Sequence, residues 1–277
     1  MGRWRAAALA GALGLLIGCE DGVERHFLYF PTRALTETPG TYGLPFEEVW
    51  FQAEDDVRLY GWFVPHQGAR ATLLWLHGNA GNIGHRAHNL RQFHDALGIN
   101  VFLFDYRGYG LSEGEPSEAG LLRDAEAAWR LLGARPDVDP GGIILFGRSL
   151  GAAVAAELAA RVQPAALILE SPFTTLMDMA RHHYWFLPVR WLVRSRYDTL
   201  GAVRRVRVPV LVLHGDADEI VPFDMGEQVF AAANEPKAFH RIRGANHNDT
   251  YMVGGKPYWE ALRAFLATAL APGRVPG

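Results

Sequence analysis

Five short runs of the sequence are almost entirely apolar, and no other feature constrains the fold as strongly. A strand with one face in water alternates apolar and polar residues, whereas a strand that is apolar at nearly every position is buried on both faces. Segments long enough to form helices separate these runs. Strands that alternate with helices predict a mostly parallel sheet covered by helices on both faces, an α/β fold. The five runs are Ala71–Leu76, Asn100–Phe104, Gly142–Phe146, Ala165–Leu169 and Val208–Leu213.

Further elements extend this pattern into one α/β domain over residues 46–272. Two strands, Glu47–Ala53 and Arg58–Val64, are expected to form an antiparallel pair at the start, and a weaker strand, Ala238–Ile242, follows the last apolar run. Apolar residues recur at helical spacing between the strands. The expected helices are Ile83–Leu97, Ser117–Leu132, Leu150–Arg161, Asp224–Ala233 and Pro257–Leu270.

Length and charge limit the classes of function. The 277 residues are 49% hydrophobic, which suits one large α/β domain with a sizeable core. The formal net charge is -3, so no basic excess suggests binding to nucleic acid.

The first residues resemble a bacterial lipoprotein signal peptide. Arg3 and Arg5 precede an apolar run, Ala6–Gly18, which is shorter than the roughly 20 residues that span a bilayer. The run ends at Cys19, the single cysteine of the chain, in a context that resembles the lipobox, where the cysteine is diacylated and becomes the first residue after cleavage. We therefore expect a signal peptide over residues 1–18, a lipidated Cys19, a tether over residues 19–45, and a location in the bacterial cell envelope on the extracytoplasmic side of a membrane. The alternative is an uncleaved anchor with an incidental cysteine.

A candidate nucleophile, Ser149, lies in the motif Gly147–Gly151, of the form G-x-S-x-G, between an apolar strand and an alanine-rich helix. In this setting the motif predicts a sharp turn that lifts the serine hydroxyl above the sheet, and glycine avoids a clash where strand and helix approach closely. The backbone N–H of Leu150 is then expected to point at the oxyanion that forms when the serine attacks a carbonyl. Arg148 is interpreted as a structural or rim residue rather than a catalytic one. The alternative is a glycine-rich helix start with a structural role only.

A second oxyanion donor is expected in the loop His77–Asn82, which follows the first apolar run. A glycine-bearing loop at this position directs a backbone N–H at the oxyanion, and we assign this role to Asn79. His77 is interpreted as ordering the loop. The alternative is an ordinary turn between strand and helix.

The base and the acid are expected after the nucleophile, with the acid first. His247 lies in a polar loop past the last predicted strand, whereas His240 lies within that strand and is interpreted as structural. Two aspartates, Asp216 and Asp218, follow the strand that ends at Leu213. We choose Asp218, because Asp216 sits in the tight turn. A buried Asp218 would fix the tautomer of His247 and stabilise the imidazolium formed during turnover.

Taken together, these motifs resemble a branch of the α/β-hydrolases that contains eukaryotic membrane-associated protein depalmitoylases and bacterial esterase-like proteins. The resemblance implies the triad Ser149, Asp218 and His247, with Asn79 and Leu150 as oxyanion donors. The eukaryotic members are anchored by a cysteine cluster near the start, whereas this chain offers Cys19 alone. The resemblance covers about residues 27–271, through Phe30-Pro31, His77–Asn82, Asp105–Gly110, Gly147–Gly151, Glu170–Phe173, His214–Pro222 and Gly244–Asp249. Arg107, within the third motif, is expected to brace its loop against neighbouring carboxylates.

An insertion over residues 171–207 is expected to form a lid over the site. Its apolar side chains suit an acyl chain or another hydrophobic ester, although each could equally pack onto the domain. From Thr175 to Arg207 there are seven arginines against Asp178 and Asp198, a formal charge of +5. Basic and aromatic residues together suit an anionic membrane surface, and the alternative is pairing of these arginines with carboxylates of the main domain. The apolar residues are Phe173, Leu176, Met177, Trp185, Phe186, Leu187, Val189, Trp191 and Leu192, and the arginines are Arg181, Arg190, Arg194, Arg196, Arg204, Arg205 and Arg207.

The expected activity is therefore hydrolysis of a small hydrophobic ester, thioester or lipid-like substrate through an acyl-enzyme on Ser149, with no metal and no organic cofactor. A serine in place of an aspartate at the turn disfavours the dehalogenase and epoxide hydrolase members of the fold. Two alternatives stay open: a serine peptidase of the same fold, and a non-catalytic lipoprotein that uses the fold as a binding module.

Overall fold

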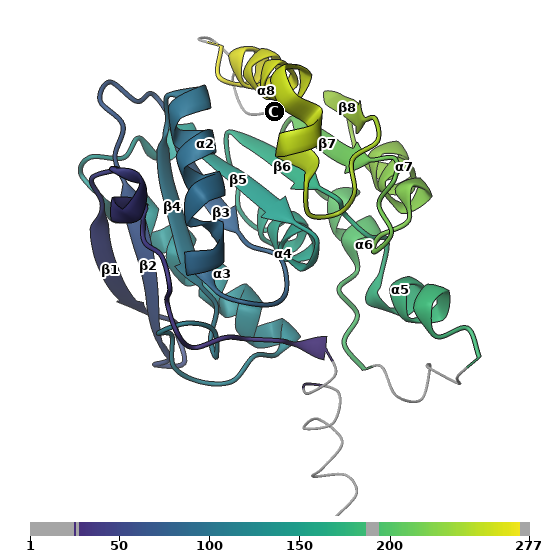
Figure 1. Cartoon of the computed structure of the whole chain (residues 1–277), viewed down its shortest axis with the longest axis horizontal. Coiled ribbons are helices and arrows are strands. Elements are labelled where there is room, and N and C mark those ends of the chain that lie inside the picture. Colours follow the sequence, from purple (N-terminus) through teal and green to yellow (C-terminus); the bar gives the residue numbers. More distant parts are fainter. Residues whose placement is uncertain (1–24, 26–27, 187–193, 272–277) are drawn as a thin grey trace, which may run out of the picture.

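The computed structural model describes residues 25, 28–186 and 194–271 (Figure 1). An eight-stranded sheet forms its centre. The first two strands are antiparallel to their neighbours, and the other six run parallel to one another. In their order across the sheet, the strands are β1 (Glu47–Gln52), β2 (Arg58–Val64), β4 (Asn100–Asp105), β3 (Thr72–Leu76), β5 (Ile143–Arg148), β6 (Ala166–Glu170), β7 (Val210–Gly215) and β8 (Lys237–Ile242).

Helices cover both faces of this sheet, so the predicted α/β architecture with a mostly parallel sheet is confirmed (Figure 1). Successive residues of a strand point to opposite faces. In β5, for example, Leu145 packs in one core and Phe146 in the other, and both are 0% exposed. One core contains residues of α2 (Ala87–Leu97) and α8 (Thr250–Ala269). The other contains residues of α3 (Glu118–Ala134), α4 (Leu150–Ala159), α6 (Thr199–Val203) and α7 (Phe223–Ala232).

Two predicted helices differ from the structure. The segment Ile83–Leu97 begins as a 3-10 turn, η2 (Ile83–Arg86), and becomes α-helical only at Ala87, because the Asn82 side chain accepts from Gly84 N and tightens the first turn. The last helix begins at Thr250 rather than Pro257, and Gly255 interrupts it with φ 49° and ψ -138°. Pro257 falls in the first turn after this interruption, where a residue without an N–H costs no helical hydrogen bond.

The chain before β1 lies against the loops at the carboxyl ends of the parallel strands. Thr32 N donates to Gly81 O, and Gly81 N donates to Phe30 O, both at 3.0 Å. The Tyr29 side chain is buried, and its hydroxyl lies 2.6 Å from the hydroxyl of Tyr197. The segment 28–33, which we call the N-terminal strap, therefore joins the loop after β3 to the chain that returns from the lid. A short 3-10 helix, η1 (Pro39–Tyr42), follows it, and another, η3 (Pro140–Gly142), precedes β5.

The lid contains α5 (Leu176–His183) and the chain that leads into α6 (Figure 1). Its residues Leu187, Val189, Arg190, Trp191 and Leu192 lie outside the described residues, as does Cys19. In the part of the chain that the structure describes, no helix is long and apolar enough to cross a bilayer.

Candidate active site

Ser149 occupies the sharp turn between β5 and α4. Its backbone adopts φ 52° and ψ -118°, a conformation that costs energy for any residue other than glycine. The two flanking glycines allow the helix to approach the sheet: a Cβ on Gly147 would lie 2.3 Å from Gly151 O, and one on Gly151 would lie 2.0 Å from Leu76 O. Ser149 N donates to Glu170 O at 2.9 Å, which holds the turn against β6. The turn predicted from the motif is therefore present with the strain that such a turn requires.

A cavity of about 570 Å³ opens above this turn and brings the predicted site residues together. Ser149, Leu150, His247 and Asn79 all line it, although they come from three separate segments of the chain. Leu150 is the first residue of α4, and the first N–H groups of a helix have no partner within the helix. Asn79 N donates to no residue in the described part of the chain. Both backbone donors are therefore free to bind an oxyanion in this cavity.

The Asp218 side chain contacts His247 and is fully buried. His247 Nδ1 lies 2.8 Å from Asp218 Oδ2, so an Nδ1–H donates to the carboxylate and Nε2 keeps its lone pair. Asp218 Oδ1 accepts from Ile220 N and Val221 N at 2.9 and 2.8 Å. Burial alone would raise the pKa of Asp218, but hydrogen bonds from His214, His247 and Val221 N outweigh burial and hold this pKa well below its usual range. The carboxylate is therefore ionised wherever a histidine titrates.

The competing aspartate, Asp216, points elsewhere. Its carboxylate accepts from Arg241 Nε at 2.8 Å and from Gly244 N at 2.6 Å. These contacts tie the loop after β7 to the loop after β8. Of the two aspartates that follow β7, only Asp218 is placed to orient His247.

The Ser149 hydroxyl donates to no residue within the described ranges. Ser149 and His247 share the cavity, but the hydrogen bond that would activate the serine is not formed in the chain alone. Hydrogen bonds between catalytic groups are often long without substrate and tighten when it binds.

The side chain of Asn79 holds its own loop in place. We call this loop, His77–Asn82, the oxyanion loop after its expected role. Its Nδ2 donates to Leu28 O at 2.5 Å, and its Oδ1 accepts from Ala80 N and from the hydroxyl of Tyr109, both at 2.8 Å. Leu28 of the N-terminal strap thus contacts the oxyanion loop, and it also lines the cavity. Because strap and loop lie about 50 positions apart, nothing in the local sequence of either segment indicated this contact.

A buried polar network lies behind the turn and ties it to the loop of His247. Arg148 Nε is 3.3 Å from Glu170 Oε1, and its Nη2 donates to His247 O. Glu170 is 1% exposed and also accepts from Thr250 Oγ1 at 2.9 Å and from the hydroxyl of Tyr258 at 2.5 Å. The sequence indicated that Arg148 is a structural or rim residue, and these contacts favour the structural role: Arg148 holds the backbone of His247.

Arg107 has the carboxylate partners that the sequence predicted. It bonds Asp124 at 2.7 Å and Asp55 at 2.8 Å, with its side chain 6% exposed. His77, expected to order its loop, is buried and bonds Gly78 O through Nδ1 at 2.7 Å. Burial lowers the pKa of His77 to about 3, so the ring is neutral near pH 7 and accepts a proton only weakly.

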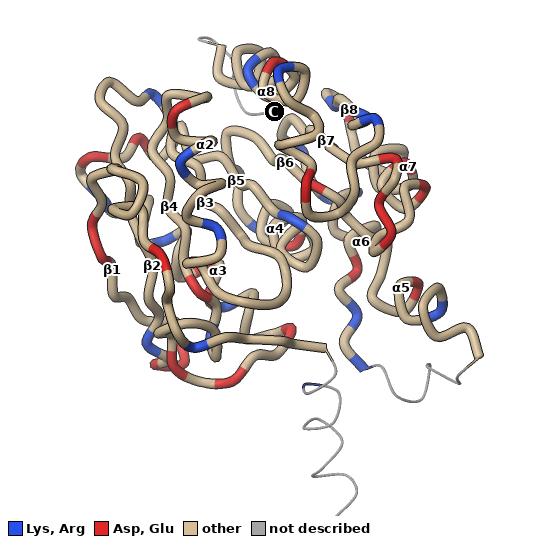
Figure 2. Tube along the Cα trace, in the orientation of Figure 1, with Lys and Arg blue, Asp and Glu red and all other residues tan. Residues whose placement is uncertain are grey.

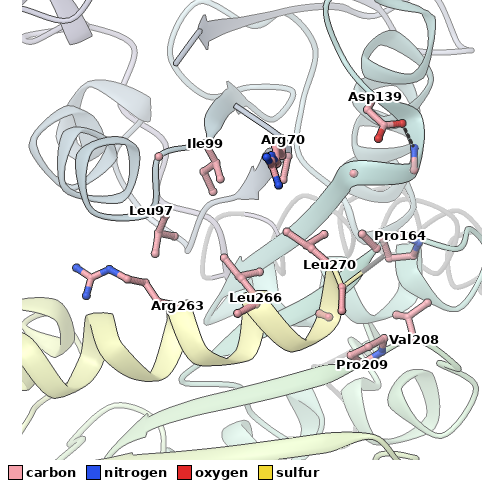
Figure 3. Close-up of a pocket in the computed structure, with 18 of the residues that line it drawn as sticks. Arg70, Leu97, Ile99, Asp139, Pro164, Val208, Pro209, Arg263, Leu266 and Leu270 are labelled. Carbon is pink, nitrogen blue, oxygen red and sulfur yellow. Dashed lines mark hydrogen bonds between the residues drawn. The ribbon is translucent and has the colours of Figure 1, made fainter. Parts of the chain in front are cut away.

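A larger cavity, of about 770 Å³, lies at the opposite ends of the strands (Figure 3). Residues that precede strands line it, among them Arg70 and Pro209, together with Leu266 of α8 and Leu270, which follows that helix (Figure 3). None of the predicted site residues lines this cavity. Ligands of parallel sheets bind at the carboxyl ends of the strands, so the smaller cavity is the candidate active site.

The described lid residues have different surroundings: some line the cavity, some are exposed, and some pack against the main domain. Phe173, Leu176 and Met179 line the cavity, whereas Trp185 and Phe186 are 81% and 64% exposed. Figure 2 shows basic residues along the chain that leads from the undescribed lid residues to α6. One of the lid arginines, Arg205, pairs with Glu157 of the main domain, and Arg196 N donates to Glu118, so part of the basic segment packs against the domain.

Comparison with known proteins agrees with this geometry. A family model described as serine aminopeptidase, S33, matches residues 67–200. An uncharacterised protein of Mycobacterium tuberculosis is 41% identical over 253 residues, which cover 91% of this chain and 90% of the relative. An esterase of Pyrococcus furiosus superposes with a TM-score of 0.74 at 22% identity, over 88% of this chain and 98% of that chain, a likeness that shows the fold. The α/β-hydrolase domain-containing protein WAV2 of Arabidopsis thaliana is 39% identical over 249 residues, which cover 83% of this chain and 81% of the relative. WAV2 aligns with this chain along most of its length, and the fold matches that of the esterase. The chain therefore belongs to the α/β-hydrolase superfamily.

Proposed function

We propose that the chain is a serine hydrolase that cleaves carboxylic esters or thioesters through an acyl-enzyme on Ser149. The observation that carries this proposal is the shared cavity: a strained serine and a histidine meet there, and Asp218 orients the histidine at 2.8 Å. A serine hydroxyl is a poor nucleophile near neutral pH and needs such a base.

The contacts support a definite sequence of steps. Ser149 Oγ attacks the acyl carbonyl while His247 Nε2 takes its proton, and the N–H groups of Leu150 and Asn79 bind the oxyanion. The imidazolium, stabilised by Asp218, then protonates the leaving alcohol or thiol as its bond to the acyl carbon breaks. Water attacks the acyl-enzyme by the same route and releases the acid, which restores Ser149.

The apolar part of the cavity favours a hydrophobic acyl substrate. Residues from the N-terminal strap, the lid and the loop after β7 bring aliphatic and aromatic side chains into the lining. Apolar lining of this kind provides most of the contact area for a small ligand, while a few polar groups fix its orientation. The residues concerned are Leu28, Phe173, Leu176, Met179 and Ile220.

Labelling with a fluorophosphonate probe tests the proposed hydrolase activity. The wild-type protein is expected to be labelled and Ser149→Ala is expected not to be, because the probe captures only an activated serine. Ser117→Ala is a matched control: Ser117 caps α3 outside the cavity, so its loss is expected to leave labelling intact. A folded wild-type protein that is not labelled would favour the non-catalytic binding module.

A peptidase is the second candidate, favoured by the description of the family model that matches residues 67–200. A series of p-nitrophenyl esters of increasing acyl length, compared with aminoacyl amides, separates the two activities. We expect the esters to be cleaved, with a rate that depends on acyl length. Faster cleavage of the aminoacyl amides would replace the esterase proposal with a peptidase.

We also propose that the mature protein is anchored through a lipidated Cys19 to the extracytoplasmic side of a bacterial membrane, with the basic lid facing that membrane. Loss of fatty-acid incorporation in Cys19→Ser tests the anchor.

Vesicle binding by a chain that begins at residue 20 tests the lid. In that chain, Arg190→Glu combined with Arg194→Glu is expected to weaken binding to anionic vesicles by at least about tenfold, since each cation near such a surface contributes about 1 kcal/mol. Arg70→Glu, at the opposite ends of the strands, is the control. Unchanged vesicle binding in the double variant would remove the lid from the proposal.

A further inference from the structure

The lining of the active-site cavity combines apolar and polar groups. The strap, the lid and the loop after β7 provide its apolar residues, as described above. The oxyanion loop and η2, in contrast, provide polar groups, and Arg86, the last residue of η2, is the cation among them. The cavity therefore offers more than a site for an acyl chain.

The charge of Arg86 is not neutralised by a carboxylate. Its Nη2 donates to two carbonyls of the oxyanion loop, Asn79 O at 3.3 Å and Ala80 O at 2.8 Å. Within the described residues, Arg86 forms no ion pair and its Nε and Nη1 donate to no residue. The second arginine of the lining, Arg148, differs, because it is paired with the buried Glu170 at 3.3 Å.

The carboxyl group that acts most on Arg86 does not balance its charge either. That group is Asp105, and burial raises its pKa to about 8, so it is mostly protonated at neutral pH. Burial also lowers the pKa of Arg86 to about 10, which leaves the guanidinium charged at neutral pH. A partly desolvated cation without a counter-charge is costly, and an anion placed beside it recovers that cost.

We propose that Arg86 binds an oxyanion of the substrate, so that the preferred substrate is an ester with an apolar group on one side of its carbonyl and a phosphate or carboxylate on the other. Guanidinium groups suit both anions, because their N–H groups match the spacing of two oxygens. This inference rests on the proposed function, since it assigns a substrate class to the same cavity. Ser149 would cleave the ester between the two groups, and Arg86 would hold the charged part.

Matched esters test the inference. 1-Octanoylglycerol, 3-octanoylglycerate and 1-octanoylglycerol 3-phosphate share the acyl chain and the reacting primary alcohol, and they differ in the charge of the leaving group. Octyl methyl succinate and octyl hydrogen succinate place the charge on the acyl side instead. We expect kcat/KM to be about tenfold to a hundredfold higher for the anionic member of at least one set, the range that hydrogen bonds to charged groups provide. The set that responds shows the side and the kind of anion.

Variants of Arg86 separate anion binding from bracing of the oxyanion loop. Arg86→Gln removes the charge but keeps an amide donor for the loop carbonyls, so we expect the preference for the anionic ester to vanish while hydrolysis of the neutral ester changes less. Arg86→Lys, which keeps the charge, is expected to retain part of the preference. Arg33→Gln is the matched control, because Arg33 also donates to loop carbonyls, Gly110 O and Ser112 O, but does not line the cavity.

Two results would overturn the inference. The first is equal kcat/KM for neutral and anionic members of every set in the wild-type protein. The second is a fall in Arg86→Gln that is equal for neutral and anionic esters, which would make Arg86 a loop brace only. Fluorophosphonate labelling and hydrolysis of the neutral ester report the proposed function separately, so failure of the anion preference with intact labelling overturns the substrate class alone.

Discussion

At the scale of single residues, the site depends on where two neighbouring aspartates point. Asp218 is buried against His247, whereas Asp216 lies at the surface with Arg241. Two positions along the chain thus separate a group that orients the base from one that joins two loops. The backbone N–H groups of Ile220 and Val221 bind Asp218 and fix its carboxylate independently of the histidine.

Asparagine substitutions at these two positions are expected to have very different effects. Asp218→Asn keeps an acceptor for the two backbone N–H groups but removes the charge and the preference for the Nδ1–H tautomer, so kcat should fall by about 10⁴-fold, as for a triad that loses its carboxylate. Asp216→Asn should change kcat by only a few fold. Steady-state hydrolysis of a p-nitrophenyl ester, with circular dichroism to establish folding, provides the comparison. Similar losses in both variants would contradict the assignment of the acid.

At the scale of secondary structure, the position of the nucleophile depends on the distance between β5 and α4. The helix lies so close to the sheet that Gly151 leaves no room for a side chain next to Leu76 O and His77 O. Backbone atoms form these obstacles, so no side-chain rotation relieves them. Leu150, the first residue of this helix, lines the cavity.

Gly151→Ala is therefore expected to destabilise the fold by about 3 kcal/mol, the upper part of the range for overpacked cores. Gly133→Ala is the matched control, because Gly133 lies in α3 with nothing within 4 Å of an added Cβ, and alanine favours a helix. Urea unfolding should show a lower midpoint for Gly151→Ala and an unchanged or higher one for Gly133→Ala. If the two midpoints moved alike, the close approach of helix and sheet would not be the reason for the glycine.

At the scale of the whole molecule, the core encloses groups that titrate. Asp105 and His77 are both 0% exposed, and Asp105 Oδ1 lies 3.8 Å from His77 Nε2. The pKa of Asp105 is raised to about 8 by burial and that of His77 is lowered to about 3, so both are neutral at pH 6 and the contact is not an ion pair. At this position the core thus holds a carboxylic acid, whereas the fully buried Asp218 is a carboxylate.

This buried acid makes stability depend on pH. The pKa of Asp105 is about 8 in the folded state, above the ordinary value of about 3.9, so the folded protein binds more protons between these values and loses stability as the pH rises through them. Asp105→Asn removes this loss, and its stability relative to wild type should rise by about 1 kcal/mol per pH unit between pH 5 and 7. Urea unfolding at several pH values provides the measurement.

Asp137→Asn serves as a control of opposite sign. A hydrogen bond from Arg135 lowers the pKa of the Asp137 carboxyl, so the carboxylate stabilises the fold at pH values above its ordinary pKa. Asp137→Asn removes this contribution, so its stability relative to wild type should not rise with pH. A difference between Asp105→Asn and wild type that stays constant with pH would show that Asp105 is ionised in the folded protein.

The sequence by itself determined the class of the fold and the local structure of the turn at Ser149. Short apolar strands between helices have one stable arrangement, a parallel sheet with helices on both faces, because both faces must leave water. The local sequence around Ser149 also sufficed, since the strained turn needs glycine at the positions where helix and strand meet. The sequence predicted the helix boundaries less accurately. At Gly255, for example, a single residue with positive φ interrupts the last helix without changing its apolar pattern.

Only the tertiary structure decided which distant residues complete the site. It placed Asp218, which the sequence had already favoured over Asp216, against His247, and it joined Arg148 to Glu170 and to the loop of His247. It also brought Leu28 to the oxyanion loop. It also left Arg86 in the cavity without a carboxylate partner among the described residues. Local sequence records the propensity of each segment. The charge balance and orientation of a side chain depend on neighbours from other strands, and these meet only after the chain has folded.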